Sequence, residues 1–326
     1  MVCMHKLSEY RTPLMGIAIV FIMLFHSGIV LKDDAMFRIF RNGDIGVEVF
    51  AVLSAIGVFS SLRKNSSTIQ FYKRRFVRIV PTYILIATPF ALFRHYHYGA
   101  SWGHVISLSL GLSTLQGDIT YWFVTFIMIC YLVAPFLFYL KRLVKIRFLL
   151  TTFSIIVSVL LFELLRERIS CCDVWLLRFP SFVLGFDIAD CVLSEKKVED
   201  FRNNVRQTIL SFFSVLAILL LVVWITTQFG NVYTRLFCYL VAVIPLMLAL
   251  CRLLDGIAVL IPSLSFLGAI TLELYLLHER ICLPVIAKFG LNNWMLMLLG
   301  IMFAVVLAWA ISKGVNTVRK HLSTKG

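Results

Sequence analysis

Apolar segments about 15 to 23 residues long recur along the whole chain, separated by short polar stretches. An α-helix needs about 20 apolar residues to cross a hydrocarbon core of about 30 Å, because it rises about 1.5 Å per residue. We therefore expect an all-α, polytopic membrane protein, a single domain over residues 1–326 with about ten transmembrane helices around a central cavity. The expected spans are 14–31, 45–62, 79–93, 119–140, 148–165, 174–193, 208–228, 236–251, 264–286 and 294–312.

The composition agrees with a chain embedded in membrane lipid. Of the 326 residues, 60% are hydrophobic and 15% are charged, whereas a soluble domain carries about 25% charged residues. The net charge of +14 lies in the loops, so we expect no nucleic-acid partner. The eight cysteines form no CxxC pair and no zinc-binding spacing, which indicates neither a disulfide framework nor a metal site.

The basic residues predict which side of the membrane each loop faces. With ten spans, the loops on the side of both termini carry more than twice as many Lys and Arg residues as the opposite loops, and include the basic segments 63–78, 141–147 and 194–207. By the positive-inside rule, both termini are expected in the cytoplasm. Segment 103–116 is short and rich in Gly and Ser, so we expect a re-entrant or interfacial piece there; an eleventh crossing would move 141–147 outside.

The densest positive charge is in FYKRRFVRIVPTY, residues 71–83. Arg74, Arg75 and Arg78 would share one face of a helix, because residues three and four positions apart are neighbours. Arginine binds phosphate oxygens bidentately and keeps its charge, so the cluster is suited to a phosphorylated ligand. A topology signal or a clamp for anionic lipid would explain the same charges.

His26 and Glu48 are ionisable residues of the first two spans, and antiparallel spans joined by a short loop would place them at similar depth. A histidine with a carboxylate beside it is the usual form of a general base. In the alternative explanation, Glu48 is solvated at the interface and His26 hydrogen-bonds a backbone carbonyl. Burying an ionisable group at membrane depth costs free energy, so its presence there favours a functional role over a structural one.

Three further polar or aromatic residues are candidates near the same face of the membrane. The segment TLELYLLHER places Glu273 and His278 in the ninth span, and Trp122 begins the fourth. With the expected topology, His278 falls in the same half of the bilayer as His26. A hydrogen-bonded core histidine and a residue of the interfacial aromatic belt are the structural explanations for His278 and Trp122.

Five segments follow one another in a recognisable order. LMGIAIVFIMLFHSG (14–28) ends in a His, GDIGVEVFAVLS (43–54) has a Gly-Val-acid triplet before an aromatic and a Ser, and YKRRFVRIVPTY (72–83) holds Arg-Arg-x-x-Arg-x-x-Pro. YWFVTFIMICYLVAPFL carries Trp122 and Pro135, and LELYLLHE carries the last His. In these segments, and over nearly its whole length, the chain resembles the acyltransferase-3 family of bacterial integral-membrane O-acyltransferases.

The resemblance implies a multi-pass protein of the bacterial inner membrane that moves an acyl group, commonly acetyl, from cytoplasmic acyl-CoA to a hydroxyl of a cell-envelope glycan or lipid-linked sugar. It also implies that His26 takes part in the transfer and that the arginine element holds the CoA phosphates. Many members carry an Arg before the Gly that matches Gly16. Met15 stands there in this chain, and Arg11, one helical turn earlier, is expected to supply the charge.

The expectations for the site are therefore specific. His26 acts as a base or a transient carrier of the acyl group and is oriented by Glu48, with no metal. The residues expected at the acyl-CoA are Arg74, Arg75, Arg78 and Arg11, and those expected at the acceptor are Trp122, Glu273 and His278. A proton-coupled transporter or flippase of a lipid-linked or small polar substrate is the alternative, with the same His and Glu residues relaying protons. A non-enzymatic relative is a third possibility, suggested by Met15.

Overall fold

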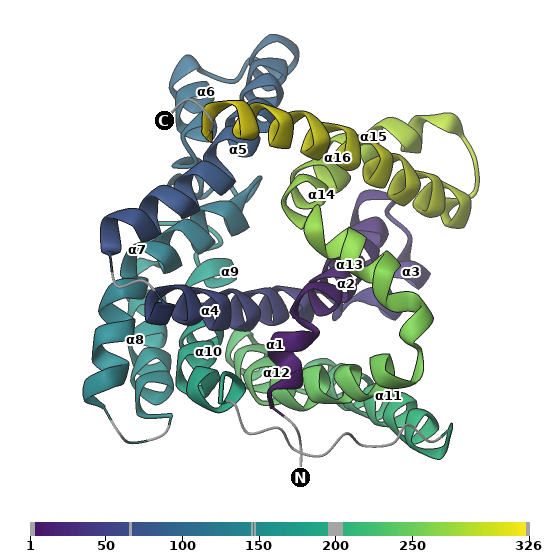
Figure 1. The fold of residues 1–326 in the computed structure, drawn as a ribbon. Coiled ribbons are helices and arrows are strands. Elements are labelled where there is room, and N and C mark those ends of the chain that lie inside the picture. The colour runs from purple at the N-terminus through teal and green to yellow at the C-terminus, as the bar shows by residue number, and fades with distance from the viewer. Residues whose placement is uncertain (1–3, 65–66, 145, 147, 195–204, 324–326) are drawn as a thin grey trace.

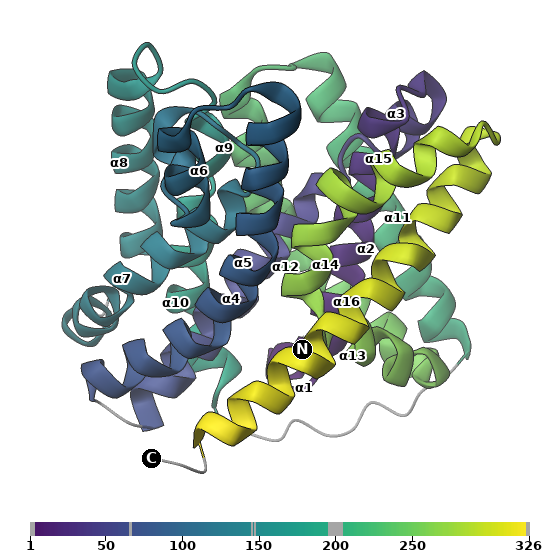
Figure 2. The ribbon, with the colours of Figure 1, turned by 90° about the horizontal axis from the view of Figure 1, so that it is seen from above.

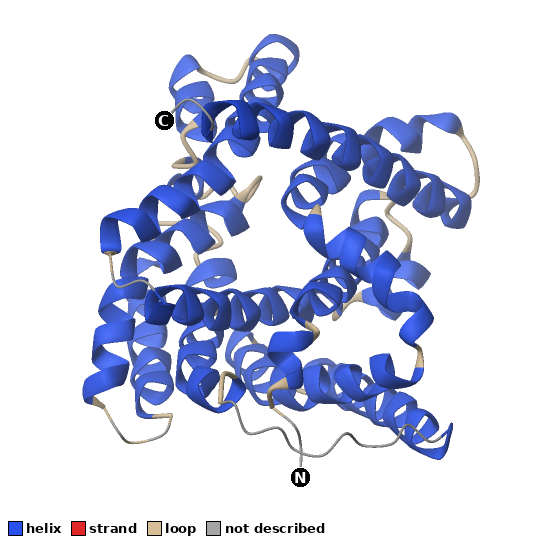
Figure 3. Cartoon of the chain, in the orientation of Figure 1, coloured by secondary structure: helices blue, strands red, loops and turns tan. Residues whose placement is uncertain are grey.

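The computed structural model describes residues 4–64, 67–144, 146, 148–194 and 205–323, and all of its regular structure is helical (Figures 1 and 3). The expected all-α class is confirmed for this part of the chain. The basic segments 63–78, 141–147 and 194–207 lie in part outside the described residues. Their contribution to the topology therefore stays a prediction.

Seven helices in the described part are long and apolar enough to cross a membrane. They are α2 (Arg11–Val30), α4 (Gly46–Lys64, extended by the turn η1, Gly43–Ile45), α5 (Thr68–Tyr98), α7 (Trp122–Leu143), α11 (Val205–Gln228), α12 (Val232–Gly256) and α16 (Asn293–Ser323). An eighth span is formed if the chain from Ala258 to Phe289, which bends by 64° after Ala269, counts as one crossing. Figure 2 shows α16 along one edge of the molecule beside α14 (Thr271–Leu277).

Two expected spans correspond to shorter helices. α8 (Leu149–Leu165) has 17 residues and α10 (Phe179–Val192) has 14. A helix of 14 residues is only about 21 Å long, shorter than a hydrocarbon core of about 30 Å. Most of the side chains of α10 are buried within the protein rather than facing outward. Seven or eight spans are thus supported by length and composition, while ten crossings and cytoplasmic termini remain predictions.

Short helices connect these elements, and two of them form the segment 103–116. α6 (Trp102–Ser109) and the turn η2 (Ser113–Gln116) have eight and four residues, so neither is long enough to cross. The other short elements are α1 (Lys6–Glu9), α3 (Asp34–Phe40), α9 (Asp173–Leu176), η3 (Ala258–Leu260), α13 (Ile261–Ala269), η4 (His278–Cys282), α15 (Leu283–Ile286) and η5 (Ala287–Phe289).

Helix α5 begins eleven residues before the expected start of the third span. The Ser67 hydroxyl caps it by accepting a hydrogen bond from the Gln70 amide at 3.4 Å. Gly99, with a φ of +68°, ends it in the left-handed conformation that glycine adopts readily. The arginine cluster therefore lies on a helix, as its spacing predicted, and this helix starts before the expected span boundary at residue 79.

Helix α4 is the most deeply buried of the candidate spans and runs through the middle of the molecule (Figure 1). It packs against α10 on one side and against α2 and α7 on others. Its contact with α10 is close because Gly185 has no side chain: an added Cβ would lie 2.5 Å from the Ala55 Cβ and 2.6 Å from the Val52 carbonyl oxygen. Small residues allow this kind of backbone approach between membrane helices.

Gly185→Ala is expected to lower stability by about 1–3 kcal/mol, because the new methyl overpacks the contact between α10 and α4. Gly314→Ala is the matched control, since among the described residues nothing outside the adjoining helix backbone lies within 4 Å of the added methyl, and alanine favours helix. Thermal unfolding in detergent, followed by tryptophan fluorescence, measures both. Equal unfolding midpoints for the two variants would show that the close approach does not matter.

Candidate active site

Helix α2 carries candidate chemistry at both of its ends. Arg11 is its first residue, and His26 lies 15 positions later, which corresponds to about 22 Å of helix. The backbone of α13 lies directly against α2, because Gly16 faces Leu264 and Gly268 faces Thr12. We call the two ends of α2 the arginine end and the histidine end.

At the histidine end, His26 and His278 are hydrogen-bonded to each other, a contact that the sequence analysis did not predict. The His26 Nδ1 atom lies 2.8 Å from the His278 Nε2 atom, and the His278 Nδ1 atom lies 2.7 Å from the Leu274 carbonyl oxygen. A carbonyl oxygen only accepts, so His278 Nδ1 carries the proton and, in a neutral pair, its Nε2 accepts from His26 Nδ1–H. These partners assign the tautomers. The His26 Nε2 atom is then the unprotonated nitrogen of the pair.

Glu279 faces this unprotonated nitrogen. Its Oε2 atom lies 3.5 Å from His26 Nε2, and its Oε1 atom accepts a hydrogen bond from Arg280 Nη2 at 3.0 Å. The side chains of His26 and Glu279 are 14% and 17% exposed, so the pair is not sealed inside the protein. A carboxylate in this position stabilises the imidazolium that forms when His26 takes up a proton.

The local helix type explains how the consecutive residues His278 and Glu279 contact one imidazole. They open a π-helix, η4, in which the turn is wider than in an α-helix. Consecutive side chains of an α-helix diverge by about 100°, and a wider turn brings them closer together. Pro284 follows in α15, four residues after Arg280. It has no N–H to donate to the Arg280 carbonyl, so a regular α-helical hydrogen bond cannot form there.

The structure gives Glu48 a different partner from the one expected. Its two carboxylate oxygens accept from Arg178 Nη1 at 2.7 and 2.8 Å, while Arg178 Nη2 bonds to Asp44 Oδ2 at 2.8 Å. The Tyr239 hydroxyl donates to Asp44 Oδ1 at 2.6 Å. His26 is contacted instead by His278 and Glu279, so Glu48 belongs to a buried charge network that joins α4, α10 and α12. Glu48 and Arg178 also line a pocket of about 130 Å³.

The other two residues expected at the acceptor are Trp122 and Glu273. The Trp122 ring lies 5.5 Å from the Arg178 guanidinium and so holds the buried charge network in place. Glu273 is buried on α14, five residues before His278. Five positions correspond to a rotation of roughly 140° around an α-helix, so Glu273 points away from the histidine pair.

At the arginine end, Arg11 of α2 and Arg75 of α5 meet on Gly57 of α4. Arg75 Nη2 donates to the Gly57 carbonyl at 3.4 Å, and an added Cβ at Gly57 would lie 2.5 Å from Arg11 Nη2. Arg11 Nε donates to the Leu53 carbonyl at 3.0 Å. The Arg75 guanidinium lies 5.1 Å from the Tyr131 ring, and its buried Nε has no hydrogen-bond partner among the described residues. Two neighbouring cations with an unused donor are chemically suited to an anion.

The other two arginines of the element are more exposed. Arg74 Nη2 donates weakly to the Ser61 hydroxyl at 3.4 Å. Arg78 is exposed, and its charge acts on Arg11 together with that of Arg75. Arg11 therefore lies in the cluster, as the departure at Met15 led us to expect. Met15 itself is buried.

Sequence reasoning missed four charged residues of the histidine end: Asp44, Arg178, Glu279 and Arg280. An arginine inside an apolar segment costs free energy unless a partner neutralises its charge, so Arg178 itself was a signal for a buried partner. The acid and the arginine that directly follow His278 were a second signal. A regular helix would have turned them away from His26, which is why the sequence alone does not bring them together.

Replacing Arg178 by Met is expected to lower stability by about 3–5 kcal/mol, because it leaves the Glu48 and Asp44 carboxylates buried without their counter-ion. Arg166→Met is the control, since Arg166 is exposed and its pair with Glu163 is worth at most about 1 kcal/mol. Thermal unfolding of both purified proteins measures the difference. An unchanged midpoint for Arg178→Met would contradict the role of the network.

The model of the acyltransferase-3 family, described as an acyltransferase domain, matches residues 14–313 of the chain. No curated protein and no solved structure is similar enough to match. The match contains α2 from Leu14 onward, the arginines of α5 and the whole histidine site, while Arg11 lies just before it. The match favours acyl transfer over the transporter alternative. The chain belongs to the acyltransferase-3 family and is a multi-pass membrane O-acyltransferase.

Proposed function

We propose that the protein transfers an acyl group, most simply acetyl, from cytoplasmic acyl-CoA to a hydroxyl of a cell-envelope glycan or lipid-linked sugar. The proposal rests on one observation: a single helix, α2, joins an arginine cluster with an unused donor to a histidine whose Nε2 is unprotonated and faces a carboxylate. These are the two sites that transfer from a phosphorylated donor to a hydroxyl requires.

The arginine end holds the donor. Arg75 and Arg11, assisted by Arg78 and Arg74, bind the nucleotide phosphates of acyl-CoA, because guanidinium groups pair with phosphate oxygens and keep their charge. The orphaned Arg75 Nε fits an anion that completes its hydrogen bonding. The pantetheine arm then extends along α2 and presents the thioester at the histidine end.

The histidine end performs the transfer. His26 Nε2 accepts the proton of the acceptor hydroxyl as its oxygen attacks the thioester carbonyl, and Glu279 stabilises the resulting imidazolium. The C–S bond breaks, and the leaving thiolate of CoA takes the proton back from His26. The hydrogen bond to His278 keeps the ring oriented throughout. In a covalent route, the same nitrogen would carry the acyl group.

His26→Gln is expected to reduce acyl transfer by about 10²–10⁴-fold, the usual contribution of a general base, and to leave acetyl-CoA binding unchanged. His97→Gln is the control, because His97 is exposed and packs only against Phe93 in the described contacts. Mass spectrometry of envelope glycans from a deletion strain that carries each variant measures the acyl groups added. Normal acylation by His26→Gln would refute the assignment of the base.

Gly57→Ala is expected to weaken acetyl-CoA binding several-fold, because the added methyl displaces the guanidinium group of Arg11. Little loss of stability is expected, because the methyl meets the end of a flexible side chain and not backbone atoms. Arg75→Gln should weaken it by about tenfold or more, the range of a lost charged hydrogen bond. Isothermal titration with acetyl-CoA measures both. Gly314→Ala is the matched control, and a donor affinity equal to wild type in Arg75→Gln would contradict the donor site.

A further inference from the structure

A small pocket lies between the buried charge network, α9 and the start of α12. It has a volume of about 130 Å³ and is lined by Glu48 and Arg178 of the network and by two further charged side chains, Asp173 of α9 and Arg235 of α12. A cavity of this size is comparable to one that holds a benzene ring. The pocket therefore has room for a small polar group of a few heavy atoms.

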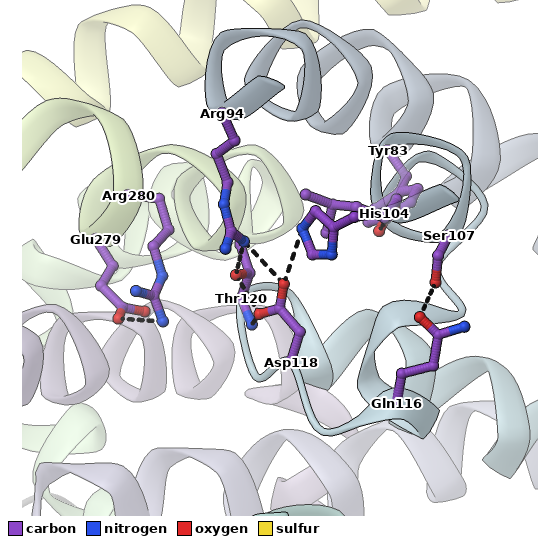
Figure 4. Close-up of polar contacts among 10 residues, drawn as sticks. Tyr83, Arg94, His104, Ser107, Gln116, Asp118, Thr120, Glu279 and Arg280 are labelled. Atoms are coloured by element: carbon purple, nitrogen blue, oxygen red, sulfur yellow. Dashed lines mark hydrogen bonds and ion pairs between the residues drawn. The ribbon is translucent and has the colours of Figure 1, made fainter. Parts of the chain in front are cut away.

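The two further charges have opposite signs, and neither is neutralised within the described part of the chain. Asp173 is half-buried and Arg235 is exposed, and neither side chain forms a hydrogen bond or an ion pair with a described residue. Arg94, for comparison, pairs with Asp118 at 2.8 Å (Figure 4). The pocket thus presents one unused cation and one unused anion to a ligand.

The charge network adds acceptor oxygens to the pocket. Glu48 and Asp44 share a single guanidinium, that of Arg178, through hydrogen bonds of 2.7 and 2.8 Å. Each carboxylate oxygen can accept more than one hydrogen bond. Glu48 and Asp173 together therefore suit a cationic group that carries several N–H donors.

An apolar groove begins where the pocket ends. It lies between α11 and α12, has a volume of about 590 Å³ and shares Asn231 with the pocket. Its far end is at Pro245, 14 residues along α12, which corresponds to about 21 Å of helix. Its walls include the exposed side chains of Leu221, Phe237 and Val241. Because both helices are long and apolar enough to cross a membrane, we expect the groove to face lipid.

The length of the groove matches one leaflet of a bilayer. Half of a hydrocarbon core of about 30 Å is about 15 Å, so a groove of about 21 Å holds an acyl chain over the whole depth of one leaflet. The charged pocket lies where α12 begins, at the level of a lipid headgroup. A single amphipathic molecule can therefore occupy both the pocket and the groove.

The charges of the pocket select among phospholipid headgroups. A phosphate pairs with Arg235, and a primary ammonium has three N–H donors for the oxygens of Asp173 and Glu48. A headgroup whose only charge is the phosphate leaves Asp173 without a cation. Choline has no N–H donor and is recognised by a cage of aromatic rings, whereas Tyr239 is the single aromatic side chain among the described residues of the pocket.

We propose that a phospholipid with an ethanolamine headgroup binds here as a structural lipid. Its ammonium lies at Asp173 and Glu48, its phosphate at Arg235, and one of its acyl chains in the groove between α11 and α12. The pocket is bounded by residues of α4, α9 and α12, so the bound lipid holds these helices together. This lipid site goes beyond the proposed function and does not depend on it.

Native mass spectrometry of the protein, purified in detergent and stripped of lipid, tests the assignment. Dioleoyl phosphatidylethanolamine is titrated in parallel with the phosphatidylcholine and the phosphatidylglycerol that carry the same chains, and the bound fraction gives the dissociation constant of each. The wild-type protein should bind the ethanolamine lipid about tenfold more tightly than either of the others, the effect of one charged hydrogen bond.

Three variants separate the parts of the headgroup. Asp173→Asn should lose most of the preference for ethanolamine over choline. Arg235→Gln should weaken the binding of all three lipids about tenfold, since all of them carry the phosphate. Arg252→Gln is the matched control, because Arg252 is also an exposed arginine of α12 and lines a second cavity, of about 320 Å³, that reaches Pro245 from the other end of the helix. It should leave all three dissociation constants unchanged.

Ala242→Phe tests the groove, because its phenyl ring fills space that an acyl chain would occupy. The affinity for the ethanolamine lipid should fall several-fold. Ala310→Phe is the control, since Ala310 is an exposed residue of α16 outside the groove. Without added lipid, Asp173→Asn and Arg235→Gln should unfold at the same temperature as wild type, because neither side chain has a partner among the described residues.

Four results would overturn the inference. They are equal affinities of the wild-type protein for the three lipids or no measurable binding of any, an unchanged preference in Asp173→Asn, unchanged binding in Ala242→Phe, and a loss of binding in Arg252→Gln but not in Arg235→Gln. The last result would place the headgroup at the other end of α12.

Discussion

Helix α2 sets the distance over which the reaction must take place. Its hydrogen-bonded backbone holds Arg11 and His26 about 22 Å apart, and it packs in close backbone contact with α13. A donor whose charged end binds at one end of the helix must therefore be long and thin to reach the other. Acyl-CoA has this shape, with its phosphates and its thioester at opposite ends of a flexible arm. The fixed helix favours this donor over a compact one.

The two ends of α2 are tied to their neighbours in different ways. At the arginine end, Arg11 and Arg75 both lie against Gly57 of α4, and the Arg75 Nε atom has no hydrogen-bond partner among the described residues. At the histidine end, a chain of hydrogen bonds from the Leu274 carbonyl through His278 fixes which nitrogen of His26 is free. The buried network around Arg178 lies nearby and holds α4, α10 and α12 together. These contacts fix the three helices relative to one another.

Much of this arrangement could be predicted from residue patterns. The apolar segments predicted most of the helices, and the positions of His26 and His278 in their expected spans placed both in the same half of the bilayer without predicting their contact. The arginine spacing predicted a shared helical face, and the family pattern pointed to Arg11 as the missing charge. The length of α10 could not be read from hydropathy, because a helix enclosed by protein does not need to span lipid. The partner of Glu48 was missed because Arg178 belongs to a different expected span, 174–193, and hydropathy does not show which spans touch. Glu279 was missed because a π-helix cannot be foreseen from periodicity.

The most direct measurement is affinity labelling with bromoacetyl-CoA, in which the donor carries an alkylating group in place of its acyl group. If the arginine cluster and His26 serve one donor, mass spectrometry will find the label on His26, and excess CoA will prevent it. Arg75→Gln should slow labelling without moving it to another residue. Labelling of other residues only, or of His26 at a rate that neither CoA nor Arg75→Gln affects, would contradict the account that α2 joins donor binding to transfer.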